Sequence, residues 1–214
     1  MSFLTIALAK GRLADKAMEY MQKTGLTCSE WDQSNRKLIL NDDSGTVRFL
    51  LVKPSDVPTY VEHGVADMGV VGKDTLLEEE CDVFEMLDLG FGACRMSVAG
   101  YPEKKKAWQS RSINRVASKY PRLSRSYCRS LGMNVETIKL NGSVELGPIV
   151  GLSDVIIDIV ESGRTLKENG LEVLDTICDI SARLIVNRAS LKTKGNLIEP
   201  LIGKLGAVVE ERRK

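Results

Sequence analysis

A glycine turn after a buried strand is the part of the sequence whose residue types best suit phosphate binding. The apolar strand expected over 154–160 runs into the turn 161–165, which reads Glu-Ser-Gly-Arg-Thr, and a short helix is expected to follow. Backbone N–H groups of a glycine turn that opens a helix form a nest for an anion, and the Ser162 and Thr165 hydroxyls add donors. The Asp158 carboxylate, near the end of the strand, would accept from sugar hydroxyls or meet a hydrated Mg²⁺.

The turn matches neither of the two common nucleotide-binding patterns. It contains no GxxxxGK[ST] of a Walker A loop and no dinucleotide fingerprint. For the four residues Ser162–Thr165 taken alone, the simpler interpretation is an ordinary helix cap. Local sequence therefore leaves phosphate binding and helix capping both open.

The chain has few residues that could support catalysis or metal binding by histidine or cysteine. His63 is the only histidine, which disfavours a Ser-His-Asp triad and a histidine-rich metal centre. The cysteines are odd in number and widely spaced, without a CxxC pair, and are expected to be reduced structural thiols: Cys28, Cys81, Cys94, Cys128 and Cys178.

Strand-like and helix-like segments alternate along the chain, and this predicts an α/β protein. Strands are expected at 3–9, 38–40, 47–52, 67–72, 94–99, 113–117, 135–140, 154–160 and 182–186, and helices at 13–21, 56–63, 121–131, 166–169 and 197–205. The acidic stretch 74–88 is interpreted as a solvated helix and its exit. Asn196 is expected to cap the last helix, with Pro200 in its first turn.

Composition describes an ordinary globular chain. The 214 residues are 43% hydrophobic and 28% charged, with a formal net charge of +1. No segment approaches the roughly 20 apolar residues of a membrane-spanning helix, and no signal peptide is recognisable, so a cytoplasmic protein without a membrane partner is expected.

One stretch is strongly basic. Residues 101–130 hold nine lysines and arginines and one acid. Nucleic-acid binding would explain this charge, but interleaved aromatic residues and a recognisable motif are missing, so no nucleic-acid partner is expected. An anionic substrate or an acidic partner subunit explains the same residues.

The stretch 145–166 resembles the signature of the ATP phosphoribosyltransferase family along its whole length. The resemblance is carried by Glu145, Gly151, Ser153, Ile156, Asp158-Ile159 and Ser162-Gly163-Arg164-Thr165-Leu166. It extends over nearly all of the chain, through 9–12, 35–38, 53–61, 66–74 and 139–143.

The resemblance implies the first step of histidine biosynthesis, in which N1 of ATP adenine displaces pyrophosphate from C1′ of phosphoribosyl pyrophosphate. It also implies a two-lobed α/β fold of the periplasmic-binding-protein type (type II), with the active site in the cleft between lobes. Lobe I would comprise 1–92 plus 181–214, and lobe II would comprise 93–180. The chain is similar to short family members, which have no C-terminal regulatory domain and work with a regulatory subunit related to histidyl-tRNA synthetase.

Site residues follow from the same resemblance. Phosphoribosyl pyrophosphate would be held by Asp154, Asp158, Glu161, Ser162, Gly163, Arg164 and Thr165. ATP would be held by Lys10, Gly11, Arg12, Arg36, Gly72 and Lys73. The catalytic cations would be Lys10, Arg12, Arg36 and Lys53, the last at a position where many relatives have arginine.

Metal and assembly are also implied by the resemblance. Mg²⁺ is expected as cofactor, bound mainly through substrate phosphates, together with a homodimer of catalytic subunits that joins the regulatory subunit in a hetero-oligomer. The alternative is a two-lobed module that binds a phosphorylated ligand without turnover.

Overall fold

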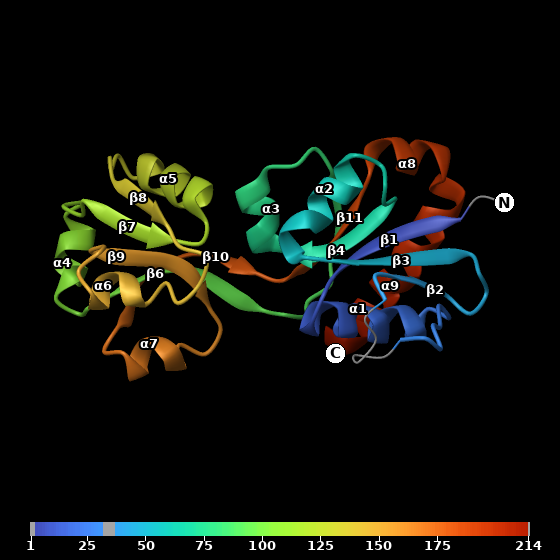
Figure 1. The fold of residues 1–214 in the computed structure, drawn as a ribbon, viewed down its shortest axis with the longest axis horizontal. Coiled ribbons are helices and arrows are strands. Elements are labelled where there is room, and N and C mark those ends of the chain that lie inside the picture. The colour runs from blue at the N-terminus through green and yellow to red at the C-terminus, as the bar shows by residue number, and fades with distance from the viewer. Residues whose placement is uncertain (1–2, 32–36, 214) are drawn as a thin grey trace. The chain divides into compact units, whose positions relative to one another are not determined.

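The chain forms two compact units. The computed structural model describes residues 3–31 and 37–213. Unit 1 comprises Met1–Gly92 and Ser181–Lys214, and unit 2 comprises Ala93–Ile180. Each unit is a mixed β-sheet with helices packed on it (Figure 1).

The sheet of unit 1 has six strands in the order β2-β3-β1-β4-β11-β5. These are β1 (Leu4–Ala9), β2 (Ile39–Asn41), β3 (Val47–Val52), β4 (Met68–Gly72), β5 (Phe84–Asp88) and β11 (Ala182–Val186). β1 is parallel to both β3 and β4, whereas β2 and β11 are antiparallel to their neighbours. The carboxyl ends of β1, β3 and β4 therefore lie at one edge of the sheet.

Helices cover both faces of this sheet (Figure 1). They are α1 (Arg12–Lys23), the 3₁₀ turn η1 (Pro54–Asp56), α2 (Val57–Glu62), α3 (Lys73–Glu79), α8 (Arg188–Thr193) and α9 (Gly195–Arg213). Leu4, Ile6 and Leu8 of β1 belong to the core beneath α1 and α9, and Ala7 and Ala9 belong to the core beneath α2. This alternation explains why all six residues of β1 are buried.

A glycine sets the approach of α2 to the sheet. A Cβ at Gly69 of β4 would lie 2.8 Å from both Val57 Cγ1 and Val61 Cγ2. Only a residue without a side chain leaves room for these two valines.

The strands expected at 38–40 and 47–52 are present as β2 and β3, which pair as an antiparallel hairpin. Its turn is fixed by Asp42, which is 6% exposed and accepts from the Val47 backbone N–H at 2.7 Å and from Ser44. Burial alone would raise the pKa of Asp42, but these hydrogen bonds to the carboxylate lower it.

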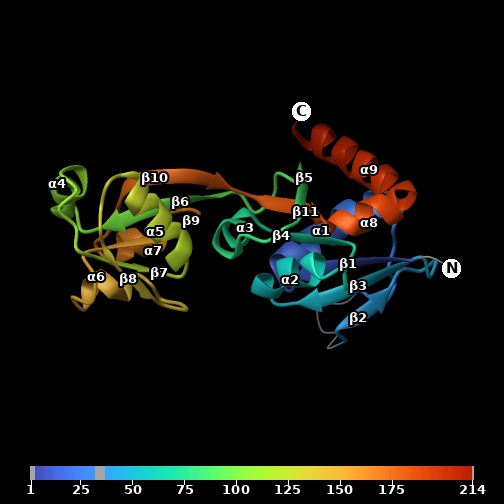
Figure 2. The same ribbon diagram turned by 90° about the horizontal axis from the view of Figure 1, so that it is seen from above.

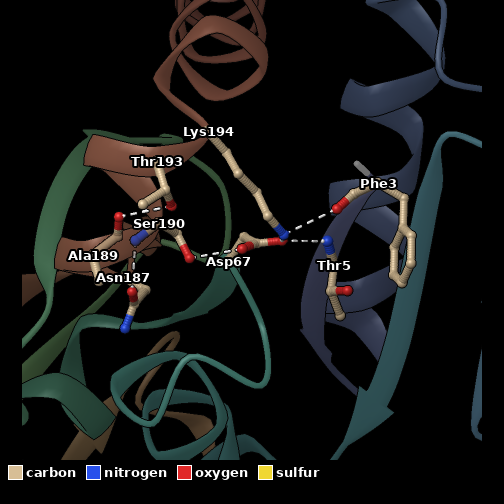
Figure 3. Close-up of polar contacts among 8 residues, drawn as sticks. All are labelled: Phe3, Thr5, Asp67, Asn187, Ala189, Ser190, Thr193 and Lys194. Carbon is tan, nitrogen blue, oxygen red and sulfur yellow. Dashed lines mark hydrogen bonds and ion pairs between the residues drawn. The ribbon is translucent and has the colours of Figure 1, made fainter. Parts of the chain in front are cut away.

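A buried carboxylate joins the amino ends of the strands to the C-terminal helices (Figure 3). Asp67 is 3% exposed. It accepts from the Thr5 backbone N–H at 2.9 Å, from Ser190 Oγ at 2.6 Å and from Lys194 Nζ at 2.8 Å. Lys194 Nζ also donates to the Phe3 carbonyl at 3.0 Å. Three chain segments therefore depend on one charge.

The sheet of unit 2 has five strands in the order β10-β6-β9-β7-β8. They are β6 (Cys94–Gly100), β7 (Arg115–Ser118), β8 (Glu136–Lys139), β9 (Val155–Val160) and β10 (Glu172–Ile180). β7, β8 and β9 are parallel, whereas β6 is antiparallel to both β9 and β10 (Figure 2). The carboxyl ends of β7, β8 and β9 share one edge with the start of β6.

Four short helices accompany this sheet: α4 (Lys104–Gln109), α5 (Pro121–Ser130), α6 (Leu146–Ile149) and α7 (Arg164–Glu168). α5 and α7 lie on opposite sides of it (Figure 1). Trp108 of α4 and Tyr127 of α5 both donate to Asp175 of β10, at 3.1 Å and 3.0 Å. Burial, together with the hydrogen bond to Asp175, raises the pKa of Tyr127 to about 12.

Several expectations need correction. The acidic stretch contains the strand β5 as well as the helix α3, and α4, α6, α8 and β10 were not expected. α9 begins at Gly195, so Asn196 does not cap it and Pro200 lies inside the helix, beyond its first turn. The asparagine that does cap a helix is Asn187, which accepts from the Ser190 backbone N–H at the start of α8.

The five cysteines are free, as expected. Over the described residues, the helices are too short or too polar to cross a bilayer.

Asp67→Asn is predicted to lower the free energy of unfolding by about 2–4 kcal/mol, because the amide loses the charge that faces Lys194 and part of its accepting capacity. Urea denaturation of the purified chain measures this. Glu19→Gln, at an exposed pair with Lys16, is the control and should change stability by less than about 0.5 kcal/mol. Equal losses of unfolding free energy in the two variants would contradict the stabilising role assigned to Asp67.

Candidate active site

The turn 161–165 leaves the carboxyl end of β9 and leads into α7. Gly163 has a φ of 71°, in the left-handed region that favours glycine. Ser162 Oγ accepts from the Arg164 backbone N–H at 3.4 Å, so this hydroxyl takes part in the local cap. The side chains of Glu161, Arg164 and Thr165 are exposed.

Asp158 belongs with this turn. It lies on β9 three residues before Glu161 and is half-buried. Its Oδ1 accepts from the Ile159 backbone N–H at 2.9 Å. A carboxylate and a glycine turn are thus brought together at one strand end.

Asp154 lies apart from this group. It precedes β9 at the opposite end of the strand, about 13 Å from Asp158 at the usual rise per residue. Its carboxylate accepts from Lys104 Nζ at 2.8 Å and from the backbone N–H groups of Asn114 and Arg115 at 3.1 Å and 3.0 Å. Although burial would raise the pKa of Asp154, these partners lower it. The structure gives this residue a local structural role.

Three strand ends meet at the edge of the unit 1 sheet. Lys10 follows β1 and Lys53 follows β3, and the two strands are paired to their last residues, Ala9 and Val52. The Lys10 backbone N–H donates to the Val52 carbonyl at 2.9 Å. Gly11, with a φ of 99°, precedes α1, whose first residue is Arg12.

Gly72 and Lys73 lie at the same edge, at the junction of β4 and α3. Gly72 is buried and Lys73 is half-buried. Lys73 Nζ forms an ion pair with Glu85 of β5, so its charge is already matched in the structure. This pair is a feature that the sequence interpretation missed.

A second ionic group follows on the same edge. Arg183 of β11 lies 3.3 Å from Glu85 and 3.2 Å from Asp88. Asp88 also accepts from Ser181 Oγ at 2.7 Å and from the Gly90 backbone N–H at 2.9 Å. These contacts join the segments at which the chain leaves and re-enters unit 1. Because the residues in these contacts are distant from one another in sequence, no local sequence pattern predicts the contacts.

The predicted residues therefore form two groups, each described within its own unit. Unit 1 gathers Lys10, Gly11, Arg12, Lys53, Gly72 and Lys73 at the carboxyl edge of its sheet, and unit 2 gathers Asp158, Glu161, Ser162, Gly163, Arg164 and Thr165. Arg36 lies outside the described residues. Cations at strand ends suit polyphosphate, and a nest beside a carboxylate suits a sugar phosphate.

Comparison with known sequences identifies the family. The HisG family model, described as ATP phosphoribosyltransferase, matches residues 53–207. A relative from Ruminiclostridium cellulolyticum named ATP phosphoribosyltransferase is 57% identical over 203 residues, covering 94% of this chain and 95% of the relative. Another from Thermoanaerobacter sp., with the same name, is 54% identical over 210 residues and 98% of both chains.

Solved structures agree. The ATP phosphoribosyl transferase (HisG:HisZ) complex from Thermotoga maritima matches with a TM-score of 0.83 and 39% identity, over 98% of this chain and 100% of that chain. The periplasmic aliphatic sulphonate binding protein SsuA from Escherichia coli matches with a TM-score of 0.61 over 100% of this chain and 75% of that chain; at 12% identity it shows the fold alone. The expected α/β fold of the periplasmic-binding-protein type is confirmed, and by sequence and structure alike the chain belongs to the ATP phosphoribosyltransferase family.

Proposed function

We propose that this chain is the catalytic subunit of a short-form ATP phosphoribosyltransferase. The enzyme transfers the 5-phosphoribosyl group of phosphoribosyl pyrophosphate to N1 of ATP adenine, giving N1-(5-phosphoribosyl)-ATP and pyrophosphate in the first step of histidine biosynthesis. The observation that carries the proposal is the turn 161–165 beside Asp158, inside the segment that matches the family.

The turn binds the 5-phosphate of phosphoribosyl pyrophosphate. Backbone N–H groups around Gly163 would donate to the phosphate, and Arg164 supplies a formal charge. Because Ser162 Oγ already accepts from Arg164 N–H, its own proton is available to a phosphate oxygen. Asp158 accepts from the ribose hydroxyls, which orients C1′ for attack.

The strand ends of unit 1 bind the ATP phosphates and the departing pyrophosphate. Lys10, Arg12 and Lys53 supply the charge, with Arg36 as a further cation from the sequence. Lys53 supplies a compact point charge, whereas an arginine at this position could contact two phosphate oxygens at once. Lys73 contributes less, because Glu85 neutralises it.

Rate acceleration comes from positioning and from neutralising charge. Adenine N1 is a nucleophile without deprotonation, so no general base is required. The cations stabilise the negative charge that develops on the leaving pyrophosphate, as the donors of an oxyanion hole stabilise an oxyanion.

Mg²⁺ fits this arrangement as a cofactor. No cluster of three acidic, histidine or cysteine ligands occurs within residues 3–31 and 37–213. Mg²⁺ usually binds through one or two carboxylates together with substrate phosphates, and Asp158 and Glu161 provide such carboxylates at the turn. When bound, the ion would neutralise the pyrophosphate and so improve it as a leaving group.

Assembly is inferred from the relative. The Thermotoga maritima structure is a HisG:HisZ complex. We expect the present chain to form a homodimer that assembles with a similar regulatory subunit, related to histidyl-tRNA synthetase. Its five free thiols suit the reducing cytoplasm.

Mass spectrometry tests the reaction. The purified chain is incubated with ATP, phosphoribosyl pyrophosphate, Mg²⁺ and pyrophosphatase, with and without the regulatory subunit. An adduct of ATP plus a phosphoribosyl group is expected. Its absence under both conditions, with phosphoribosyl pyrophosphate still bound, would favour a binding module without turnover.

Gly163→Val is predicted to abolish binding of phosphoribosyl pyrophosphate while the unit remains folded. A β-branched residue is strained at this positive φ, and its Cβ would lie 3.7 Å from Val160 Cγ1, so the turn must shift and its backbone N–H groups lose their positions. Isothermal titration calorimetry measures the affinity, and circular dichroism checks the fold. Gly170→Val, also at a positive φ of 71° but after α7, is the matched control for backbone strain. Unchanged affinity in Gly163→Val would place the phosphate site elsewhere.

Arg12→Ala is predicted to raise the KM for ATP by about 10- to 100-fold, the loss expected for charge-assisted hydrogen bonds to phosphate. Arg12→Lys should recover part of this loss because the charge remains. Lys192→Ala, an exposed cation on α8, is the control. Equal KM values for Arg12→Ala and the control would remove Arg12 from the site.

A further inference from the structure

Arg95 of β6 lies on the same face of the unit 2 sheet as the phosphate turn. β6 pairs with β9 without a register shift, so that Arg95 is opposite Val160. Ala99 and Val160 belong to one core layer with Leu166 of α7. Because side chains alternate along a strand, Arg95, which is four residues before Ala99, lies on this same α7 face.

The turn itself lies over Val160. A Cβ added to Gly163 would be 3.7 Å from Val160 Cγ1. Adjacent strands are separated by about 4.8 Å, so the Arg95 backbone is one strand away from the residue beneath the glycine. An extended arginine side chain is longer than that distance, so from this position it is long enough to contact a ligand bound at the turn.

The guanidinium of Arg95 has no ion pair or hydrogen bond with another side chain in the part of the chain that the structure describes, and Arg95 is exposed. In this respect it differs from the paired cations Lys104 and Arg183. On the other neighbouring strand, β10, the residue directly opposite Arg95 is the acid Asp179, which is also exposed.

We propose that Arg95 is a substrate-binding residue whose guanidinium binds the 5-phosphate of phosphoribosyl pyrophosphate. This assignment rests on the proposed function, because it takes the turn 161–165 as the phosphate site. The turn offers backbone N–H dipoles and one formal positive charge, on Arg164, whereas a phosphate dianion carries two negative charges. Arginine supplies that charge in a planar fork that matches two phosphate oxygens. Arg95 approaches from the sheet side of the turn, and Arg164 belongs to the turn itself.

The test separates the two phosphates of the substrate. Isothermal titration calorimetry is carried out with ribose 5-phosphate, with phosphoribosyl pyrophosphate and separately with inorganic pyrophosphate. The proteins are the full chain and its variants Arg95→Ala, Arg95→Lys and Arg129→Ala. Arg129, exposed in the last turn of α5, is the control because its removal changes net charge equally. Arg95→Ala should bind ribose 5-phosphate about 10- to 100-fold more weakly, Arg95→Lys should be intermediate, and pyrophosphate affinity should not change.

Three results would overturn the assignment, and they differ in what they say of the proposed function. If the wild-type chain binds ribose 5-phosphate and Arg95→Ala binds it equally well, Arg95 is not a ligand but the phosphate site stands. If Arg95→Ala weakens only pyrophosphate binding, the residue serves the other phosphate group. Absence of binding to both ribose 5-phosphate and phosphoribosyl pyrophosphate in the wild-type chain would contradict the proposed function together with this inference.

Discussion

The parallel strand is the constraint on which both candidate binding regions depend. A strand that is parallel to its neighbour must end at the same sheet edge, so the residues that follow these strands are collected there however far apart they lie in sequence. Lys10, Lys53 and Gly72 come from three such strands of unit 1. In unit 2 the same rule places the turn after β9 beside the ends of β7 and β8.

Ion pairs distinguish two kinds of cation in the described part of the chain, those that face a carboxylate within the fold and those that do not. Lys194, Lys104 and Arg183 each face a carboxylate within 3.3 Å. An anionic ligand would have to compete with these internal partners. Lys10 and Lys53, which follow β1 and β3, and Arg95, the second residue of β6, are by contrast exposed and form no ion pair among residues 3–31 and 37–213. Their positive charge is available without breaking a contact, which favours phosphate binding over structural use.

Sequence predicted those elements whose apolar pattern is continuous. β1, β4, β9 and β11 are buried along most of their length and read as apolar runs. β10 was missed because acids interrupt it, and its Asp175 is tolerated only because Trp108 and Tyr127 donate to it from distant helices. For the same reason Glu85, whose partners Lys73 and Arg183 are remote in sequence, was interpreted as solvated.

A family signature does not assign one role to all of its residues. Its first part builds the sheet: Gly151 accepts from Arg115 through its carbonyl, Ser153 is 5% exposed, and Ile156 is in the core. Its last part, from Asp158 to Thr165, lies at the opposite end of β9 and forms the turn. Asp154 and Asp158 look equivalent in sequence, yet Asp154 precedes β9 and Asp158 lies near its carboxyl end. The Asp154 carboxylate accepts from Lys104, Asn114 and Arg115, and the Asp158 carboxylate accepts from the Ile159 backbone N–H beside the turn 161–165. Strand geometry, rather than proximity in sequence, therefore decides which of the two carboxylates lies beside the glycine turn.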